Sequence, residues 1–117
     1  MKAAKSGIGK ISSISGHRIG SDWVLETATG KITFLRINAV GSGFGPPDDF
    51  IDVECIIKLA SRPTKAFGFR IRDIDSPDRA MFELIRDTFF HGRVLFAEYL
   101  IQPGRNNGIL YRAVVQS

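Results

Sequence analysis

Residues 75–92 have the sequence DSPDRAMFELIRDTFFHG, and they form the one segment of this chain for which we predict a helix. Ser76, Pro77 and Asp78 supply a capping side chain, a proline at the first helical position and an acidic first turn. Gly92 predicts where the helix ends. Between these two ends, apolar side chains and one threonine recur at intervals of three and four positions, which predicts a face packed on a core. These residues are Met81, Phe82, Leu84, Ile85, Thr88 and Phe89.

The segments before the helix predict strands. In residues 31–40, Leu35 and Ile37 alternate with polar or exposed positions, which is typical of a half-buried strand. Residues 51–59 alternate in the same way, and a turn at residues 60–65 leads to a strand that places Phe67, Phe69 and Ile71 on one face. Earlier in the chain we expect an N-terminal hairpin in residues 9–29. Its strands are residues 9–19 and 22–29, and a turn at Thr29 and Gly30 separates it from the next strand.

The segment after the helix predicts a second hairpin. Its strands are residues 93–101 and 109–116, and residues 102–108 between them are rich in Gly and Asn, which tolerate positive φ. Except for Arg112, residues 109–115 are apolar on both faces, as expected of a strand that is covered on both sides.

The register between residues 51–59 and the following strand can also be predicted. If both apolar faces point into one core, Leu59 pairs with Phe67. Glu54 then pairs with Arg72 on the outer face, and Arg70 lies opposite Ile56.

From residue 31 onward the expected order is strand, strand, strand, helix, strand, strand, which is the order of the OB-fold. Residues 67–90 and 94–99 resemble the small single-domain bacterial OB-like proteins, in which a strand, a capped helix and a closing hairpin follow one another. The resemblance implies a mainly β fold, a small barrel with one helix. It implies no single function, because that family is mixed and includes relatives of sugar-binding toxin B subunits. The chain differs from it by the extra hairpin of residues 9–29 and by the lack of an export signal in its first residues.

The length of 117 residues predicts one domain, and 44% hydrophobic with 24% charged residues is an ordinary globular composition. We divide residues 1–117 into a flexible basic tail (residues 1–8), the extra hairpin (residues 9–29) and the OB-like barrel (residues 31–117). No run of residues is long and apolar enough to span a membrane, and the first residues contain no apolar leader. We therefore expect a soluble, cytoplasmic protein, unless an upstream export signal has been removed.

The residue types that carry catalysis or bind metals are few. Cys55 is the single cysteine and lies on the apolar face of its strand, so we predict a core residue and neither a disulfide nor a cysteine-based zinc site. His91 falls in the last helical turn, where we expect it to cap the negative end of the helix. His17 is expected in a turn, and Asp73 with Asp75 precede the helix without a nearby histidine. We predict no catalytic residue, no metal and no cofactor.

The net charge of +4 raises the question of nucleic-acid binding, but the excess lies in residues 1–31, and residues 32–75 carry as many acidic as basic residues. OB-type barrels bind ligands across the outer face of their second and third strands and the flanking loops. The candidate ligand-binding residues on that face and in those loops are Phe44, Arg70, Arg72, Arg105 and Asn106. The alternative is structural: Phe44 packs back onto the barrel, and Asn106 only forms the turn.

Two functions follow from this sequence. The first is a non-catalytic binding or protein-interaction module for a protein or glycan ligand, assembled as a homo-oligomer if the extra hairpin or residues 109–115 pair with another subunit. The alternative is single-stranded nucleic-acid binding, which requires Lys10, Arg70 and Arg105 to form one positive track. The sequence favours the first, because carboxylates cancel the charge of the expected outer face and Phe50 is the one ring expected there.

Overall fold

The computed structural model describes residues 20, 22–38, 55–71 and 77–116, and the backbone of residues 13–14 and 17–18. In this part of the chain the fold is mainly β with one helix, as predicted. The elements are β1 (Ser13–Ile14), β2 (His17–Arg18), β3 (Val24–Ile37), β4 (Cys55–Leu59), β5 (Arg62–Phe69), α2 (Pro77–Phe90), β6 (Val94–Ile101) and β7 (Asn107–Val114).

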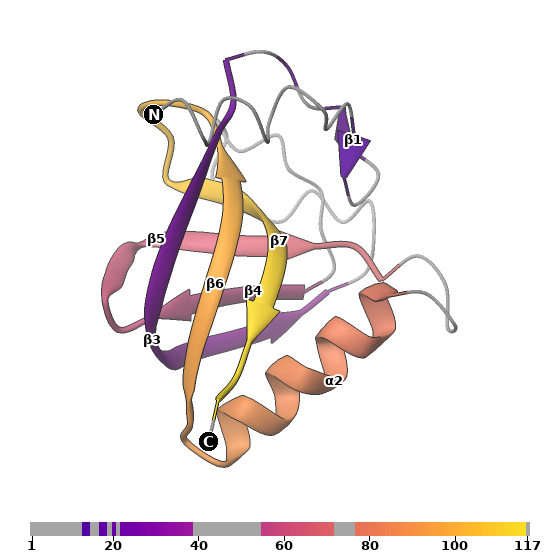
Figure 1. Ribbon diagram of the computed structural model, residues 1–117, viewed down its shortest axis with the longest axis vertical. Coiled ribbons are helices and arrows are strands. Elements are labelled where there is room, and N and C mark those ends of the chain that lie inside the picture. Colours follow the sequence, from indigo (N-terminus) through magenta and orange to yellow (C-terminus); the bar gives the residue numbers. More distant parts are fainter. Residues whose placement is uncertain are drawn as a thin grey trace.

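Five strands form one sheet that closes on itself, in the order β3, β4, β5, β7, β6 and back to β3 (Figure 1). Every neighbouring pair is antiparallel except β5 and β7, which run parallel. The short strands β1 and β2 pair with each other in a separate hairpin. No helix in the described residues is long and apolar enough to cross a membrane.

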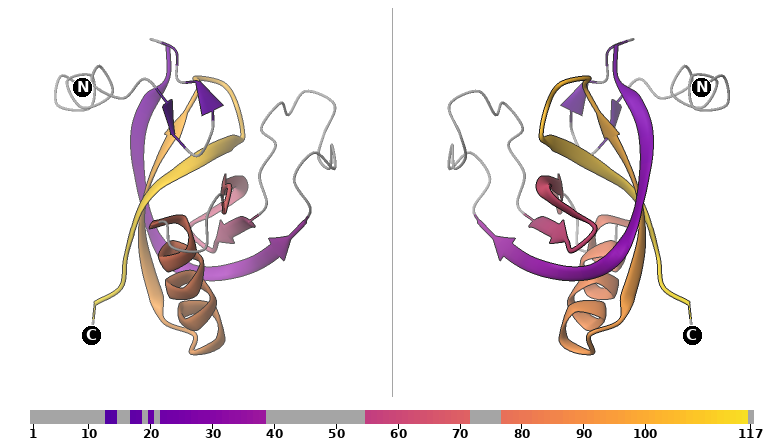
Figure 2. Two further views of the ribbon diagram at one scale, coloured as in Figure 1. Left: turned by 90° about the vertical axis from the view of Figure 1, so that its right-hand side faces the viewer. Right: turned by 90° about the vertical axis from the view of Figure 1, so that its left-hand side faces the viewer.

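The long strand β3 makes the closure possible. Its first half, up to Lys31, pairs with β6, and its second half, from Ile32, pairs with β4. Figure 2 shows β3 running down one side of the sheet and curving beneath it. The predicted turn at Thr29 and Gly30 is therefore wrong, and residues 24–29 belong to β3 rather than to an N-terminal hairpin. A glycine stands at position 30 for a different reason. A Cβ there would lie 3.1 Å from the Ser61 Oγ, so the glycine allows the β4–β5 turn to approach β3 closely.

The β4–β5 hairpin differs from its predicted register by two residues. Phe67 pairs with Ile57, not with Leu59. The reason is a shorter turn, because β5 begins at Arg62 and Leu59 pairs with Arg62 across a bulge. The expected odd-with-odd pairing still holds along most of the hairpin, so the apolar residues face inward as predicted. Glu54 and Arg72 lie outside the described residues.

The last hairpin is confirmed with a shorter turn than predicted. β6 ends at Ile101 and β7 already begins at Asn107, and the Arg105 N–H donates to the Gln102 carbonyl within the turn at 3.1 Å. The expectation that the last strand is covered on both faces holds for its first half. Ile109 and Leu110 are buried, whereas Tyr111 and Arg112 are exposed.

Helix α2 has Pro77 at its first position, as predicted, and it ends in a Schellman motif. The Arg93 N–H donates to the Thr88 carbonyl at 3.1 Å, the Gly92 N–H donates to the Phe89 carbonyl at 3.2 Å, and Gly92 has a φ of 63°. The predicted apolar face is confirmed: Ile85 and Thr88 are buried. Ser76, the expected cap, lies outside the described residues.

The interior of the closed sheet holds the main apolar cluster. Cys55 belongs to it and is fully buried, which confirms the core role predicted for it. Side chains of all five strands and Ile85 of α2 meet there; the buried members are Ala28, Ile32, Cys55, Ile57, Leu59, Phe67, Phe69, Ile85, Leu95, Ala97, Tyr99, Ile101 and Leu110. Helix α2 thus packs against one end of the sheet (Figures 1 and 2).

A second apolar cluster lies on the outer face of the sheet. Its buried members are Trp23, Ile56, Leu100 and Ile109. Trp23 is only 4% exposed although it stands just before β3, so the chain entering β3 covers this part of the outer face. The single tryptophan of the chain therefore packs against the sheet.

Tyr99 carries a polar group into the main cluster. Its ring is fully buried and stacks on Phe67 with the ring centroids 4.0 Å apart, and its hydroxyl donates to the Glu26 Oε1 at 3.0 Å. Burial raises the pKa of the Tyr99 phenol above its ordinary value of 10.0, the hydrogen bond and the charge of Glu26 raise it further, and Arg62 opposes the shift. The folded state therefore holds the neutral phenol above the pH at which an unfolded chain releases its proton.

This pKa shift predicts an alkaline loss of stability. The contribution of Tyr99 is fully present below pH 10 and decreases as the pH rises, because the unfolded chain then binds fewer protons than the folded one. We expect the Tm of the wild type to fall more steeply between about pH 9 and pH 11 than that of Tyr99→Phe. Calorimetry across this range is the measurement, and Tyr111→Phe, which removes an exposed phenol, is the control. Equal slopes for the wild type and Tyr99→Phe would contradict this account.

Candidate functional site

Two of the five residues predicted from the sequence to bind a ligand lie in the β6–β7 turn. The Asn106 carbonyl accepts a hydrogen bond from the Ala66 N–H at 2.8 Å, and the Lys65 Nζ approaches the Arg105 carbonyl at 3.4 Å. The turn therefore joins the start of β7 to β5 through its backbone. Phe44 and Arg72 lie outside the described residues.

Arg70 lies far from this turn. Strands β5 and β7 run parallel with Ala66 beside Asn107, so Arg105 is level with Thr64, six residues before Arg70. Six strand residues correspond to about 20 Å. The structure therefore does not bring Arg70 and Arg105 together, and a continuous track between them would cross the buried outer cluster around Ile109.

A different group of residues does come together on the outer face of β3 and β4. The Lys58 Nζ lies 5.3 Å from the centroid of the Phe34 ring, and the Arg36 Cζ lies 6.0 Å from the same centroid. Both distances are in the range of cation–π attraction. The ring is 36% exposed. We call Phe34, Arg36 and Lys58 the Phe34 patch.

A β-bulge in β3 turns this ring outward. Ile32 pairs with Leu59 and Phe34 pairs with Lys58, so Thr33 is the extra residue, and its hydroxyl lies 3.4 Å from the Lys58 carbonyl. Without the extra residue Phe34 would face the interior like Ile32. With it, Leu35 packs against the core instead, and Phe34 faces outward together with Arg36.

The described parts of the strands that carry the Phe34 patch contain several basic residues. Residues 31–38 and 55–71 contain six basic side chains and no carboxylate. The basic residues are Lys31, Arg36, Lys58, Arg62, Lys65 and Arg70. The six acidic residues that balance the charge of residues 32–75 all lie in segments outside the described residues. Two described acids pair with arginines elsewhere, Glu98 with Arg112 at 2.7 Å and Glu83 with Arg79 at 3.4 Å.

The Phe34 patch borders the covered part of the outer face. Arg36 pairs with Ile56, and Ile56 belongs to the outer cluster beneath Trp23. The outer face of the sheet thus has an apolar part that the chain covers and an aromatic, basic part in which Phe34 is 36% exposed.

An open hollow of about 540 Å³ lies at the C-terminal end of α2. It is lined by Leu84, Asp87, Thr88, His91, Arg93 and Val115. The His91 Nδ1 lies 2.8 Å from the Asp87 carbonyl oxygen, and because a carbonyl only accepts, this nitrogen carries the hydrogen and donates. The capping role predicted for His91 is confirmed. The Asp87 carboxylate pairs with Arg86 at 3.2 Å, so His91 and Asp87 do not form an acid–base pair.

The remaining candidates for acid–base chemistry or metal binding cannot be placed with His91. Asp73, Asp75 and the His17 side chain lie outside the described residues. Within the described residues, no group of three or more His, Cys, Asp and Glu side chains is arranged to hold a metal ion.

Comparison with known proteins gives no relative: no family model, no curated protein and no solved structure matches this chain. The function is therefore argued from the Phe34 patch itself.

Sequence reasoning missed the Phe34 patch although part of its signal was visible. The alternation in residues 31–40 placed Phe34 and Arg36 on the face opposite Leu35 and Ile37. The sequence did not indicate the register between β3 and β4, which places Lys58 beside Phe34. The expected site was placed on the next two strands and in the flanking loops.

Proposed function

We propose that the protein is a non-catalytic binding module with an OB-like barrel, and that it binds single-stranded nucleic acid on the Phe34 patch. The barrel assignment is supported by the order of elements from β3 onward, which is strand, strand, strand, helix, strand, strand. It is supported also by the closure of the five strands.

The observation that carries this proposal is one accessible ring with two cations beside it. Proteins that bind single strands without sequence preference stack bases on aromatic side chains and hold phosphates with basic ones. Phe34 offers the ring, while Lys58 at 5.3 Å and Arg36 at 6.0 Å offer the charges. Both kinds of contact fall within the span of one or two nucleotides.

The same geometry favours an unpaired strand over a duplex. A base in a duplex is already stacked on its neighbours and does not present its face to a protein ring. Phe34 faces outward from β3 by its pairing with Lys58. Figure 2 shows that β3 is strongly curved, and a flexible single strand can follow such a surface.

Titration of a fluorescein-labelled oligothymidylate tests this function. Stacking on an aromatic ring is worth about 1–3 kcal/mol per base, so Phe34→Ala is expected to weaken binding by about tenfold. Tyr111→Ala, which removes an exposed ring from β7, is the matched control and should bind like the wild type. Phe34→Trp should retain binding. Two phosphate contacts predict a roughly sevenfold loss of affinity between about 50 and 200 mM salt.

An affinity that does not change with salt or with Phe34→Ala would exclude this function. The ligands expected first from the sequence, a protein or a glycan, would then be tested by a glycan array, and the homo-oligomer by sedimentation.

A further inference from the structure

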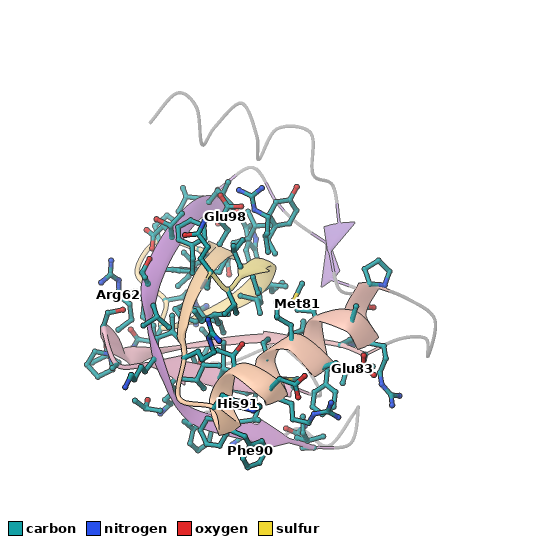
Figure 3. The ribbon with its side chains drawn as sticks, turned by 60° about the horizontal axis from the view of Figure 1, so that its bottom comes forward. Arg62, Met81, Glu83, Phe90, His91 and Glu98 are labelled. Carbon is teal, nitrogen blue, oxygen red and sulfur yellow. The ribbon has the colours of Figure 1, made fainter. Side chains whose placement is uncertain are left out.

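The most exposed large apolar side chain in the described part of the chain is Phe90, at the end of α2. It is 74% exposed, and its ring meets Phe89 edge to face with the centroids 5.3 Å apart. Figure 3 shows Phe90 pointing away from the end of α2, beyond His91, on the side where the helix contacts β3. Neither the core nor the outer cluster includes this ring.

The fold connects Phe90 to the Phe34 patch through one strand pair. Val94, four residues after Phe90, pairs with Lys31, which stands three residues before Phe34. Lys31 is exposed and Val94 is 49% exposed. The chain lengths involved limit the distance between the Cα atoms of Phe34 and Phe90 to about 30 Å. Such a path fits the 4–16 nucleotides that one OB fold occupies.

The charges along this path suit a phosphate backbone. Lys31 lies between the two rings, and Arg93 stands beside Val94. The negative end of α2 is largely satisfied, because carbonyls of its last turns accept hydrogen bonds from Gly92, Arg93 and His91. The carboxylate of Asp87 is paired with Arg86.

We propose that Phe90 is a second base-stacking platform, so that a bound single strand runs from the Phe34 patch past Lys31 to the end of α2. This proposal rests on the proposed function and extends it beyond the sheet, because it predicts the length and the direction of the strand that the protein covers.

Two oligothymidylates test it, one of about 4 nucleotides that covers the Phe34 patch alone and one of about 15 nucleotides that reaches both rings. Phe90→Ala is expected to lower the affinity for the long oligonucleotide by about tenfold, because one stacked base is lost. The affinity for the short oligonucleotide should not change. Phe90→Leu, which keeps apolar bulk without a stacking face, should behave like Phe90→Ala, and Phe90→Trp should bind like the wild type. Phe34→Ala is expected to lower the affinity for both oligonucleotides.

The outcomes separate the two proposals. If Phe34→Ala weakens binding and Phe90→Ala binds the long oligonucleotide like the wild type, the second platform is wrong and the proposed function stands. If neither oligonucleotide binds the wild type, the proposed function itself fails. If Phe90→Ala alters the sedimentation of the free protein while its affinity is unchanged, the ring serves self-association, and the second platform is again overturned.

Discussion

Reversing the two charges of the Phe34 patch, with Lys58→Glu and Arg36→Glu together, is expected to lower the affinity for an oligothymidylate on the order of 100-fold at low salt. Each substitution removes a cation from beside the Phe34 ring and places a carboxylate where a phosphate would bind. Bringing like charges together at the site costs about 1 kcal/mol or more per pair. Fluorescence anisotropy at about 50 and 200 mM salt is the measurement, and the salt dependence should nearly vanish in the double variant.

The control for this experiment changes net charge by the same amount on another surface. Arg79 lies on α2 and pairs with Glu83, and Arg112 lies on β7 and pairs with Glu98. Arg79→Glu with Arg112→Glu should bind within about twofold of wild type, since screening at 0.1 M salt acts over about 10 Å. An equal loss in both double variants would mean that net charge alone governs binding. Lys58→Glu alone is measured as well, in case the double variant does not fold. The fluorescence of buried Trp23 reports whether the outer cluster is intact.

The helix was predictable because its signals are local. Pro77 and Asp78 at its start, the apolar spacing along it and Gly92 at its end act within a few residues of one another. The strands were recognised for the same reason, through their alternation. Their pairing was not, because a hairpin register depends on the length of its turn, and that turn begins and ends where the rest of the sheet requires. The shift that pairs Phe67 with Ile57 shows this.

Gly30 shows a second limit of sequence reasoning. A glycine between polar residues indicates a turn, but the same residue also permits close packing. Only the folded chain brings Ser61 next to Gly30, so the sequence did not indicate that close packing was the reason for this glycine. The error divided β3 in two and assigned its first half to a separate hairpin.

The candidate site depends on the same long-range information. Phe34 and Arg36 come from β3, and Lys58 comes from β4, more than twenty positions later. Composition identified an excess of basic residues, but only the pairing of two distant strands places two of them beside one ring. The bulge at Thr33, which turns Phe34 outward, has no sequence signature of its own.

Phe67→Ala is expected to lower the free energy of unfolding by about 3–5 kcal/mol, a large effect for a single substitution. Phe67 is fully buried and stacks on Tyr99 at 4.0 Å. Its strand position pairs with Ile57 of β4 on one side and with Gly108 of β7 on the other, where the parallel pair closes the sheet. Truncation therefore leaves a cavity at the closure, and the surrounding strands cannot collapse into it without breaking that pairing.

The matched control is the same substitution at a surface site. Phe90→Ala removes the same atoms, but its ring is 74% exposed, so we expect a loss within about 1 kcal/mol. Denaturant unfolding followed by Trp23 fluorescence measures both variants. Because domains of this size are stable by about 5–15 kcal/mol, Phe67→Ala removes a large share of the total, whereas Phe90→Ala removes little. Similar losses at the two positions would mean that Phe67 is not packed as described, and that closure of the sheet does not depend on its ring.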